Sequence, residues 1–183
     1  MSIKKIRQIV DGLLFKFGDN STRVKIARKM GVKIGTNCLL FNSGFGSEPY
    51  LISIGDHCEI TAGVIFITHD GATWVFRENK KFLGSKFGPI KIHDNCFIGL
   101  NSIILPNVEV GPNSVIGAGS VVTKNVLANS VYGGNPAKFI CTLEEYLNKC
   151  LYNNRGDMGI NDWDGEGQKE RIIKMFEKKP DEK

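Results

Sequence analysis

His69 and Asp70 are the residues of this sequence that are best suited to acid–base chemistry. They stand where a regular spacing of apolar residues ends and a long irregular segment, 70–89, begins. A histidine exchanges a proton near neutral pH, and a general base works best when a rigid element holds it beside a loop. We expect Asp70 to orient the imidazole ring or to raise its basicity. The residues alone leave a second role open for His69, that of a structural histidine.

The element that must position His69 is built from a six-residue repeat. Residues 92–127 divide into six consecutive units, and each unit begins with Ile or Val. The fifth residue of each unit is small or of modest size: Cys96, Ser102, Val108, Ser114, Ser120 and Val126. A six-residue period fits neither an amphipathic helix nor a simple alternating strand. It predicts a parallel β-helix, in which short straight segments turn corners and stack on the coil before them.

We expect three parts: an N-terminal helical cap at residues 1–33, a β-helix domain at 34–140, and a C-terminal helical extension at 141–183. Two excursions, at 42–50 and 70–89, interrupt the coils. A coil of roughly eighteen residues encloses little volume. The binding site is therefore expected on an excursion or between subunits. Spacing and composition predict helices at residues 3–17, 21–30, 142–151 and 168–179.

Length and charge set further bounds. The 183 residues fit one domain with appendages. The sequence has no apolar run long enough for a transmembrane helix and no signal-peptide pattern, so we expect a cytoplasmic protein. Residues 1–33 carry nine basic side chains against two acidic ones, a local net charge of +7. This charge fits a solvated helix face, or attraction to a polyanionic ligand or an acidic membrane surface. No nucleic-acid recognition motif accompanies it, so no nucleic-acid partner is expected.

Metal chemistry has little support in the sequence. A zinc-dependent hydratase on a β-helix needs three converging histidines. His57 is the fourth residue of its repeat and His93 the second, which argues against convergence with His69. We expect His57 to face solvent and His93 to be structural, and we expect no metal.

The five cysteines form no CxxC pair, so neither a zinc site nor a redox motif is indicated. Cys38, Cys58 and Cys96 are each fifth in a repeat and are expected to point into the coil. Cys141 and Cys150 lie beyond the repeats and are expected to pack on a helix.

Three segments, 89–99, 116–124 and 134–138, resemble the hexapeptide-repeat acyltransferases. These include maltose, galactoside and nodulation acetyltransferases and the O-acetyltransferases of capsule and lipopolysaccharide clusters. Residues 68–77 look most like the last group, and the whole resemblance covers about residues 34–140. It implies an all-β fold, a left-handed parallel β-helix with an N-terminal helical cap and a C-terminal helical segment. It also implies a homotrimer in which acetyl-CoA lies between adjacent subunits.

The resemblance also implies catalytic roles. His69 matches the histidine that takes the proton of an acceptor hydroxyl or amine as that group attacks the thioester carbonyl. The backbone N–H of Leu100, which follows the Ile98–Gly99 pair, matches the donor that stabilises the oxyanion. Leu100 is bulkier than the Gly or Ser often found at this position, but a backbone donor does not depend on the side chain.

The residues implied in acetyl-CoA binding are Phe97, Gly99, Leu100, Gly117, Ala118, Thr123, Lys124, Pro136 and Lys138. Phe97 matches a position that often holds Trp, and Lys124 and Lys138 suit the CoA phosphates. Gly117 and Ala118 can also be read as simple coil corners, and Lys138 as a solvated charge. Cys141 stands near a position where many relatives carry another basic residue. A contact from this position to a CoA phosphate is therefore not expected.

Residues on the two excursions are expected to bind the acceptor: Asn42, Glu48, Tyr50, Trp74 and Arg77. Asn42 roughly matches an acceptor-binding Asn of the sugar acetyltransferases. Trp74 is expected either to stack on a sugar ring or to anchor its own loop.

The sequence therefore predicts an acetyl-CoA-dependent O-acetyltransferase that acts on a saccharide in surface polysaccharide biosynthesis. His69 would be the general base of a direct attack, without a covalent enzyme intermediate. The acceptor is a saccharide or a nucleotide- or lipid-linked sugar, and work at a membrane surface is possible but not required. The alternatives are an acetyltransferase for an amino sugar, serine or an antibiotic, and a non-catalytic scaffold.

Overall fold

A computed structural model describes residues 3–41, 43–78, 84–153, 170 and 173 of the chain. It divides the chain into two compact units, Met1–Glu144 and Glu145–Lys183. The first unit contains the coils and everything that positions the candidate site. The second contains most of helix α3 (Leu143–Asn153), which agrees with the helix expected at 142–151. The helix expected at 168–179 lies outside the described residues, apart from residues 170 and 173.

Three sheets of short strands form the sides of the coils in the described residues. Sheet A consists of β1 (Lys33–Ile34), β3 (Ile52–Ile54), β8 (Ile90–Ile92) and β11 (Glu109–Val110). Sheet B consists of β2 (Leu39–Leu40), β4 (Glu59–Ile60), β9 (Phe97–Ile98), β12 (Val115–Ile116), β14 (Ser130–Gly133) and β15 (Lys138–Thr142). Sheet C consists of β5 (Ile65–Phe66), β10 (Ile103–Ile104) and β13 (Val121–Val122).

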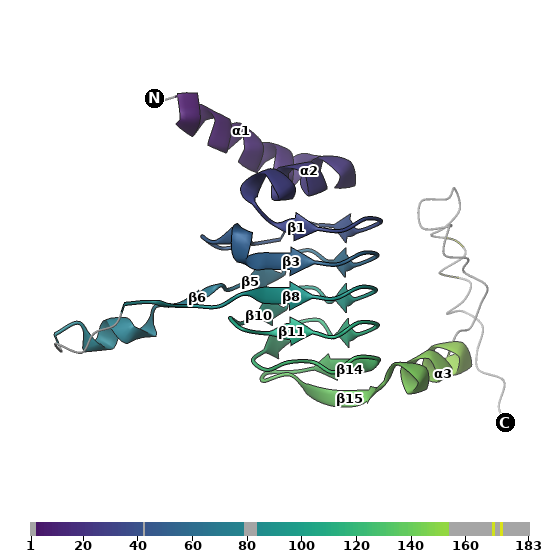
Figure 1. Ribbon diagram of the computed structural model, residues 1–183. Helices are drawn as coiled ribbons and strands as arrows, with labels where there is room; N and C mark the ends of the chain where they lie inside the picture. Colours follow the sequence, from purple (N-terminus) through teal and green to yellow (C-terminus); the bar gives the residue numbers. More distant parts are fainter. Residues whose placement is uncertain (1–2, 42, 79–83, 154–169, 171–172, 174–183) are drawn as a thin grey trace. The chain divides into compact units, whose positions relative to one another are not determined.

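Neighbouring strands in these sheets pair in parallel, except that β15 returns antiparallel to β14. The coils stack in chain order (Figure 1), as the repeat predicted.

The interior is filled by every second residue of a strand, because side chains alternate between the two faces of a strand. The register pairs Ile54 with Ile92 and Ile60 with Ile98, so inward side chains of similar size lie on one another. The inward residues that are buried are Leu40, Ile54, Ile60, Phe66, Ile92, Ile98, Ile104, Val110, Ile116 and Val122. These positions thus form a column of branched aliphatic side chains with one aromatic ring, that of Phe66.

The small residues at the fifth position are buried at the corners, as expected. The thiols of Cys58 and Cys96 donate to the carbonyl oxygens of His93 and Gly111, at 3.0 and 3.1 Å. Cys38 makes the same contact with Gly55, and burial raises the pKa of its thiol. Burial and these bonds to backbone carbonyl groups give the column a structural role. Cys141 differs from the prediction, because it lies buried in strand β15 and not on a helix.

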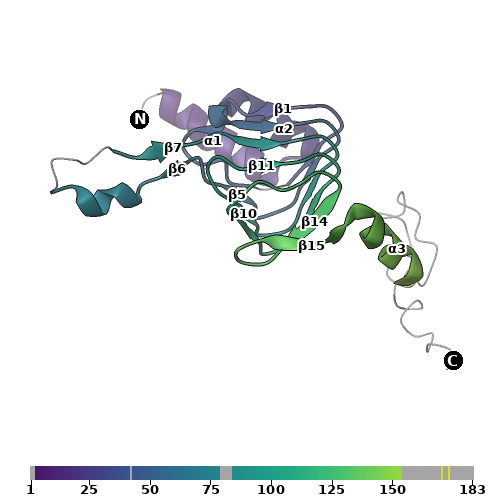
Figure 2. The same cartoon turned by 60° about the horizontal axis from the view of Figure 1, so that its bottom comes forward.

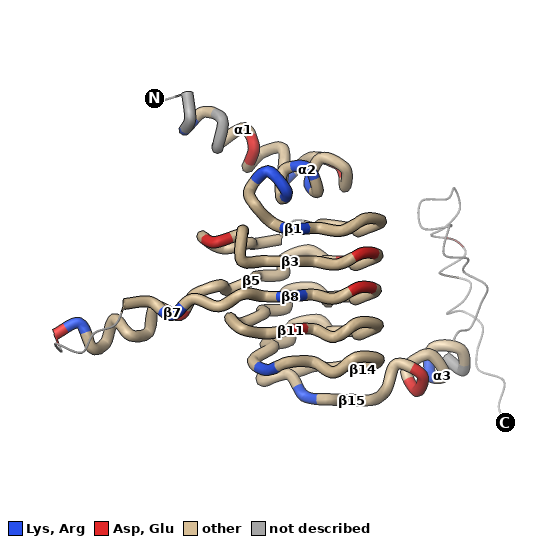
Figure 3. The backbone as a smooth tube through the Cα atoms, in the orientation of Figure 1, with Lys and Arg blue, Asp and Glu red and all other residues tan. Residues whose placement is uncertain are grey.

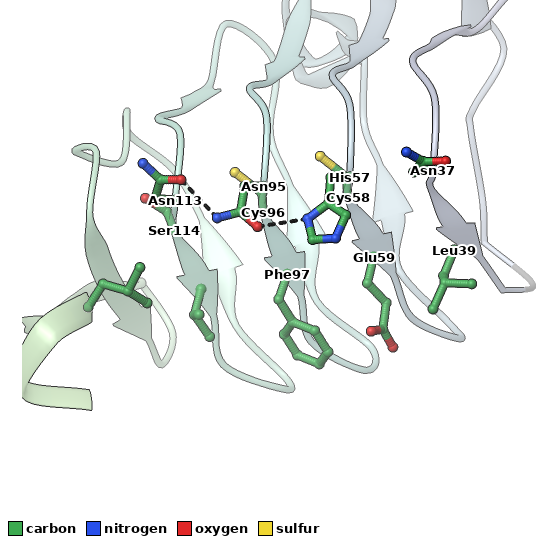
Figure 4. A pocket seen from close by; sticks show the side chains of 12 residues that line it. Asn37, Leu39, His57, Cys58, Glu59, Asn95, Cys96, Phe97, Asn113 and Ser114 are labelled. Atoms are coloured by element: carbon green, nitrogen blue, oxygen red, sulfur yellow. Dashed lines mark hydrogen bonds between the residues drawn. The ribbon is translucent and has the colours of Figure 1, made fainter. Parts of the chain in front are cut away.

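A second column follows the outer side of the same corner. Asn37, His57, Asn95, Asn113 and Asn129 all have positive φ angles, which asparagine tolerates better than most residues. Asn95 Oδ1 lies 3.0 Å from His57 Nδ1, and Asn95 Nδ2 donates to Asn113 Oδ1 at 2.8 Å (Figure 4). His57 is exposed, as predicted, and takes part in this ladder. His93 contacts Glu109 through Nε2 at 3.2 Å, in agreement with a structural role.

Two helices cover the first coil, as predicted for the cap: α1 (Ile3–Phe17) and α2 (Asn20–Met30). Asp19 caps α2 by accepting the Thr22 N–H at 2.8 Å, and this bonding lowers the pKa of Asp19. The Asn20 side chain accepts from the Leu40 N–H at 2.7 Å and donates to the Cys38 carbonyl at 3.0 Å. It thereby satisfies backbone groups of the first coil that have no coil beyond them.

Both excursions contain ordered elements. The first includes the short helix η1 (Pro49–Leu51). The second leaves the coil along β6 (His69–Asp70), turns through η2 (Ala72–Phe76) and returns along β7 (Lys86–Phe87). β6 and β7 form an antiparallel ribbon that projects from the coils (Figure 2).

Gly99→Ala is expected to lower the free energy of unfolding by about 1–3 kcal/mol. A Cβ at Gly99 would lie 2.5 Å from the Ala118 nitrogen, whereas at Gly117, one coil further, the nearest atom would be the Tyr132 carbonyl oxygen at 3.5 Å. Gly117→Ala is therefore the matched control and should lose much less stability. Urea unfolding followed by circular dichroism measures both variants. Equal losses would contradict the close approach at Gly99.

Candidate active site

His69 lies at the edge of sheet C where the chain leaves the coil. It follows strand β5 and opens the β6–β7 ribbon, in which it pairs with Phe87. The two rings lie side by side, with centroids 5.7 Å apart and planes inclined by 45°. The imidazole is 39% exposed, so one side of it is open to a substrate. The coil therefore presents His69 on a rigid edge, as the sequence predicted.

The partner of His69 is Glu48, from the first excursion. His69 Nδ1 lies 2.9 Å from Glu48 Oε2, and the same oxygen accepts the hydroxyl of Thr68 at 2.6 Å. Thr68 is buried, and the Glu48 side chain is only 12% exposed. The two excursions thus meet at one carboxylate.

The first excursion is anchored so that Glu48 has a fixed position. Phe45 is buried, and its ring stacks on Phe66 at 5.6 Å and meets Phe15 edge-on at 5.8 Å. Gly44 bridges to Ile65 of strand β5. These contacts make residues 44–45 part of the coil wall next to the His69 strand.

The charge state of this pair follows from its hydrogen bonds. The Thr68 hydroxyl, and after it the His69 ring, lower the pKa of Glu48 below its ordinary value. Glu48 is therefore an anion at neutral pH and accepts the Nδ1–H of His69. A neutral imidazole that donates through Nδ1 carries its lone pair on Nε2. The arrangement produces a base with a defined tautomer and a defined orientation.

Asp70 does not have the role expected for it. Its Oδ1 accepts the backbone N–H of Ala72 at 2.8 Å, which closes a local turn at the start of η2. The group at the His69 ring is Glu48, which the sequence had suggested as an acceptor ligand. Thr68 and Phe87 were missed. The return strand of an excursion must lie beside its outgoing strand, so pairing the two ends of segment 70–89 could have identified Phe87.

The opposite edge of sheet C holds the corner that contains Gly99 and Leu100. In the next coil, the same corner contains Gly117 and Ala118. The Gly119 N–H donates to the Leu100 carbonyl at 2.7 Å, and the Gly99 N–H donates to Ile116 at 2.8 Å. These bonds hold the peptide of Leu100 in place, while its side chain is 49% exposed.

The remaining residues expected at CoA are distributed over both edges. Thr123 and Lys124 follow strand β13, so they lie at the same edge of sheet C as His69 and are exposed. Pro136 belongs to the exposed β14–β15 turn, and Lys138 is the exposed first residue of β15. That turn is tied to sheet C, because the Ala137 N–H donates to the Val121 carbonyl at 2.8 Å.

Phe97 lies on a different side of the coil. It is the outward residue of β9 on sheet B, where it lines a groove of about 280 Å³ together with Leu39, Glu59 and Val115 (Figure 4). Partial burial in this groove raises the pKa of Glu59. Phe97 and His69 therefore do not share one surface of a single chain.

Of the acceptor residues expected on the excursions, Glu48 is largely covered at the His69 ring, whereas Tyr50, Trp74 and Arg77 are exposed. Tyr50 lies on η1 and is 64% exposed. Trp74 lies on η2 with the same exposed fraction, and the Arg77 guanidinium is 5.3 Å from the centroid of its ring. Asn42 lies outside the described residues.

A parallel β-helix with a histidine–carboxylate pair at its edge is an arrangement that can support acyl transfer. Two family models match the chain: "Bacterial transferase hexapeptide (six repeats)" at residues 89–124 and "Hexapeptide repeat of succinyl-transferase" at residues 31–67. Protein CapG of Staphylococcus aureus is 54% identical over 129 residues, which cover 69% of this chain and 74% of CapG. The galactoside O-acetyltransferase of Lactococcus lactis is 31% identical over 160 residues, which cover 74% and 75% of the two chains. The chain belongs to the hexapeptide-repeat acetyltransferase family, and the predicted left-handed parallel β-helix is confirmed.

Solved structures show the same fold. A hexapeptide-repeat acetyltransferase from Vibrio cholerae aligns with a TM-score of 0.55 at 22% identity, over 75% of this chain and 89% of its own. Another structure of that enzyme is a complex with acetyl-CoA, with a TM-score of 0.50, 22% identity and coverage of 73% and 83%. A galactoside acetyltransferase in complex with coenzyme A aligns with a TM-score of 0.55 at 24% identity, over 79% and 83% of the two chains.

Glu48→Gln is expected to make the stability of the protein less dependent on pH in the acid range. The pKa of Glu48 is lowered on folding, so its stabilising effect is complete above its unfolded pKa and disappears as the pH falls through its folded pKa. The difference in unfolding free energy between wild type and Glu48→Gln should therefore shrink between about pH 5 and pH 3. Urea unfolding across this range measures it.

Thr68→Val provides the companion measurement, because the Thr68 hydroxyl is the main cause of the lowered pKa. This variant should therefore show a smaller pH dependence of the unfolding free energy in the acid range than wild type. If the unfolding free energies of wild type and Glu48→Gln change in parallel with pH, the lowered pKa of Glu48 is contradicted.

Proposed function

We propose that this protein transfers an acetyl group from acetyl-CoA to a hydroxyl of a saccharide, with His69 as the general base. The observation that carries the proposal is the Glu48–His69 contact at the edge of sheet C. The O-acetyl product is supported by the galactoside O-acetyltransferase of Lactococcus lactis. The donor is supported by acetyl-CoA in the related structure from Vibrio cholerae. The resemblance of residues 68–77 supports an acceptor from surface polysaccharide biosynthesis.

The proposed reaction is a direct transfer. His69 Nε2 takes the proton of the acceptor hydroxyl as the oxygen attacks the thioester carbonyl. Glu48 stabilises the imidazolium that forms, and the Leu100 N–H donates to the oxyanion of the tetrahedral intermediate. When the carbon–sulfur bond breaks, the imidazolium returns the proton to the leaving thiolate. The products are the acetyl ester and CoA, and His69 is neutral again.

The fold favours a site formed by two subunits. His69 lies at the edge where the strands of sheet C end, and Leu100 lies at the edge where they begin. One sheet therefore separates the base from the proposed oxyanion donor within a single chain. If three chains assemble side by side, the His69 edge of one subunit can face the Leu100 edge of its neighbour. The heterologous contacts of a closed ring have this geometry.

The outer surfaces of the coils also favour a trimer. Sheet C presents Ile65, Ile103 and Val121 outward. Sheet B presents Leu39, Phe97 and Val115 together with one acidic residue, Glu59. Sheet A presents Lys33, Ser53, Lys91 and Glu109. A trimer that buries faces B and C and leaves face A in water accounts for this difference.

The proposed donor and acceptor contacts use groups of suitable chemistry. Gly117 and Ala118 leave space for the pantetheine arm, and the ammonium groups of Lys124 and Lys138 suit phosphates. Trp74 suits the apolar face of a sugar ring, and the neighbouring Arg77 suits its hydroxyls or an attached phosphate.

His69→Ala is expected to lower the rate of sugar-dependent thiol release by about 10²–10⁴-fold, the usual contribution of a positioned general base. The oligomeric state and the affinity for CoA should change little, because His69 is on the surface edge and not in the core. Thiol release from acetyl-CoA with a panel of sugars and nucleotide-sugars measures the activity. Full activity of the variant would remove His69 from the mechanism, and the absence of CoA binding in the wild type would overturn the proposed donor.

Mixed oligomers test whether the site is shared. His69→Ala removes the base at one edge of sheet C, and Ala118→Trp blocks the donor side at the other edge. Co-expression of the two inactive chains should restore about a quarter of the wild-type activity, because random trimers then contain some sites with both edges intact. Each variant expressed alone is the control. A site contained in one chain would give no restoration.

A further inference from the structure

Helix α1 exposes an apolar face that the rest of the described chain does not cover. The strongly exposed residues of this face are Ile6, Ile9, Val10, Leu13 and Phe17, and Phe17 is 74% exposed. Together with Leu14, which is 45% exposed, these residues recur at helical spacing and occupy one side of the helix, an arc of about 140° at 100° per residue. A surface helix normally turns such a side toward the core, so its exposure needs an explanation.

The contacts that hold α1 to the rest of the described chain lie on the side opposite to this face. Phe15 is buried and meets Phe45 of the first excursion. Asp11 pairs with Lys29 of α2 at 2.5 Å, and the Phe15 carbonyl accepts from Arg23 of α2 at 3.2 Å. By the same spacing, Asp11 and Phe15 lie on the opposite side of α1 from Leu13 and Phe17. The helix is therefore fastened to α2 through its other side.

Positive charge accompanies this face. Lys5 and Lys16 fall at one border of the apolar arc, and the Lys16 ammonium lies 5.2 Å from the centroid of the Phe17 ring. The acidic residues of segment 1–33 are both engaged, Asp11 with Lys29 and Asp19 as the cap of α2. Figure 3 shows Lys and Arg on α2 at the same end of the coils. An occupant of this face must therefore accept apolar side chains and cations together.

A second copy of α1 is a poor match for these requirements. A coiled coil needs a narrow apolar seam over about three to four heptads and opposite charges beside it. α1 has 15 residues and a wide apolar side, and its flanking residues Lys5 and Lys16 are both basic. Copies packed through this face would bring like charges together.

An anionic lipid surface meets both requirements. Acyl chains accept the apolar side, and phosphate headgroups accept the lysines. A helix of 15 residues is shorter than the roughly 20 residues that cross a bilayer. Among the described helices none is long and apolar enough to span a membrane.

We propose that α1 lies in the plane of an anionic membrane surface, with Leu13 and Phe17 among the acyl chains and Lys5 and Lys16 at the headgroups. The helix then holds the cap end of the coils against the lipid. This inference is independent of the acetyl-transfer reaction. In an oligomer, several copies of α1 would act together and strengthen the binding.

The test is co-sedimentation of the full chain with vesicles. Vesicles with about one third phosphatidylglycerol in phosphatidylcholine are compared with vesicles of phosphatidylcholine alone. The wild type should bind the anionic vesicles at least tenfold more tightly, and salt should weaken this binding.

The variant Leu13→Glu with Phe17→Glu should lose at least tenfold in affinity for the anionic vesicles. Leu127→Glu is the matched control, because Leu127 is 67% exposed but lies on a coil corner; it should bind like wild type. Lys5→Gln with Lys16→Gln is a second variant that keeps the apolar face and should lose mainly the preference for anionic lipid. Acetyl transfer to a soluble acceptor should be unchanged in all of them, so a failure of the proposed reaction is recognised separately.

Three results would overturn the proposal. The first is a wild-type protein that binds neither kind of vesicle. The second is a Leu13→Glu with Phe17→Glu variant that binds the anionic vesicles as tightly as the control. In the third, sedimentation velocity without lipid shows that this double variant breaks the oligomer, which would assign the face to a second copy of the chain.

Discussion

Hydrogen bonds between successive coils determine where the coil residues of this protein lie. The Ile65 N–H donates to the Ser102 carbonyl at 2.9 Å, and the Ile103 N–H donates to the Ser120 carbonyl at 2.7 Å. Because the same bond recurs from coil to coil, the strands of sheet C begin at one edge and end at another. Residues that follow these strands therefore gather at one edge, and residues that precede them gather at the other. The candidate catalytic groups are distributed between the two edges for this reason.

The same stacking moves the chemistry to the outside of the molecule. Inward residues are large aliphatic side chains in register, and the small residues at the corners allow the backbone to turn. Little volume remains for a substrate in such an interior. Polar groups that act on a substrate must therefore come from the excursions, which are free of the repeat, or from the outer corners of the coils. Phe45 is the link between the two systems, because it fills the coil wall and thereby fixes the excursion that carries Glu48.

The sequence was sufficient for the features that repeat. The coil positions, the buried fifth residues and the placement of His69 at the start of an excursion all follow from the six-residue period. The helical cap follows from the helical spacing of apolar residues at 3–17. It was insufficient for the contacts that connect excursions. Glu48 and His69 are 21 residues apart, and their contact depends on how both loops leave the coil. Asp70 is adjacent to His69 in sequence, but its carboxylate bonds to the backbone two residues ahead, a local contact that short acidic side chains readily make.

We propose that His69 of one subunit and the Leu100 corner of its neighbour form one acetyl-transfer site. A crystal structure of the protein with bound CoA would locate the thiol. We expect the thiol between the His69 imidazole of one subunit and the Leu100 N–H of the next, with Glu48 still at Nδ1. A thiol far from His69, or one bound between the two edges of a single chain, would contradict the proposal.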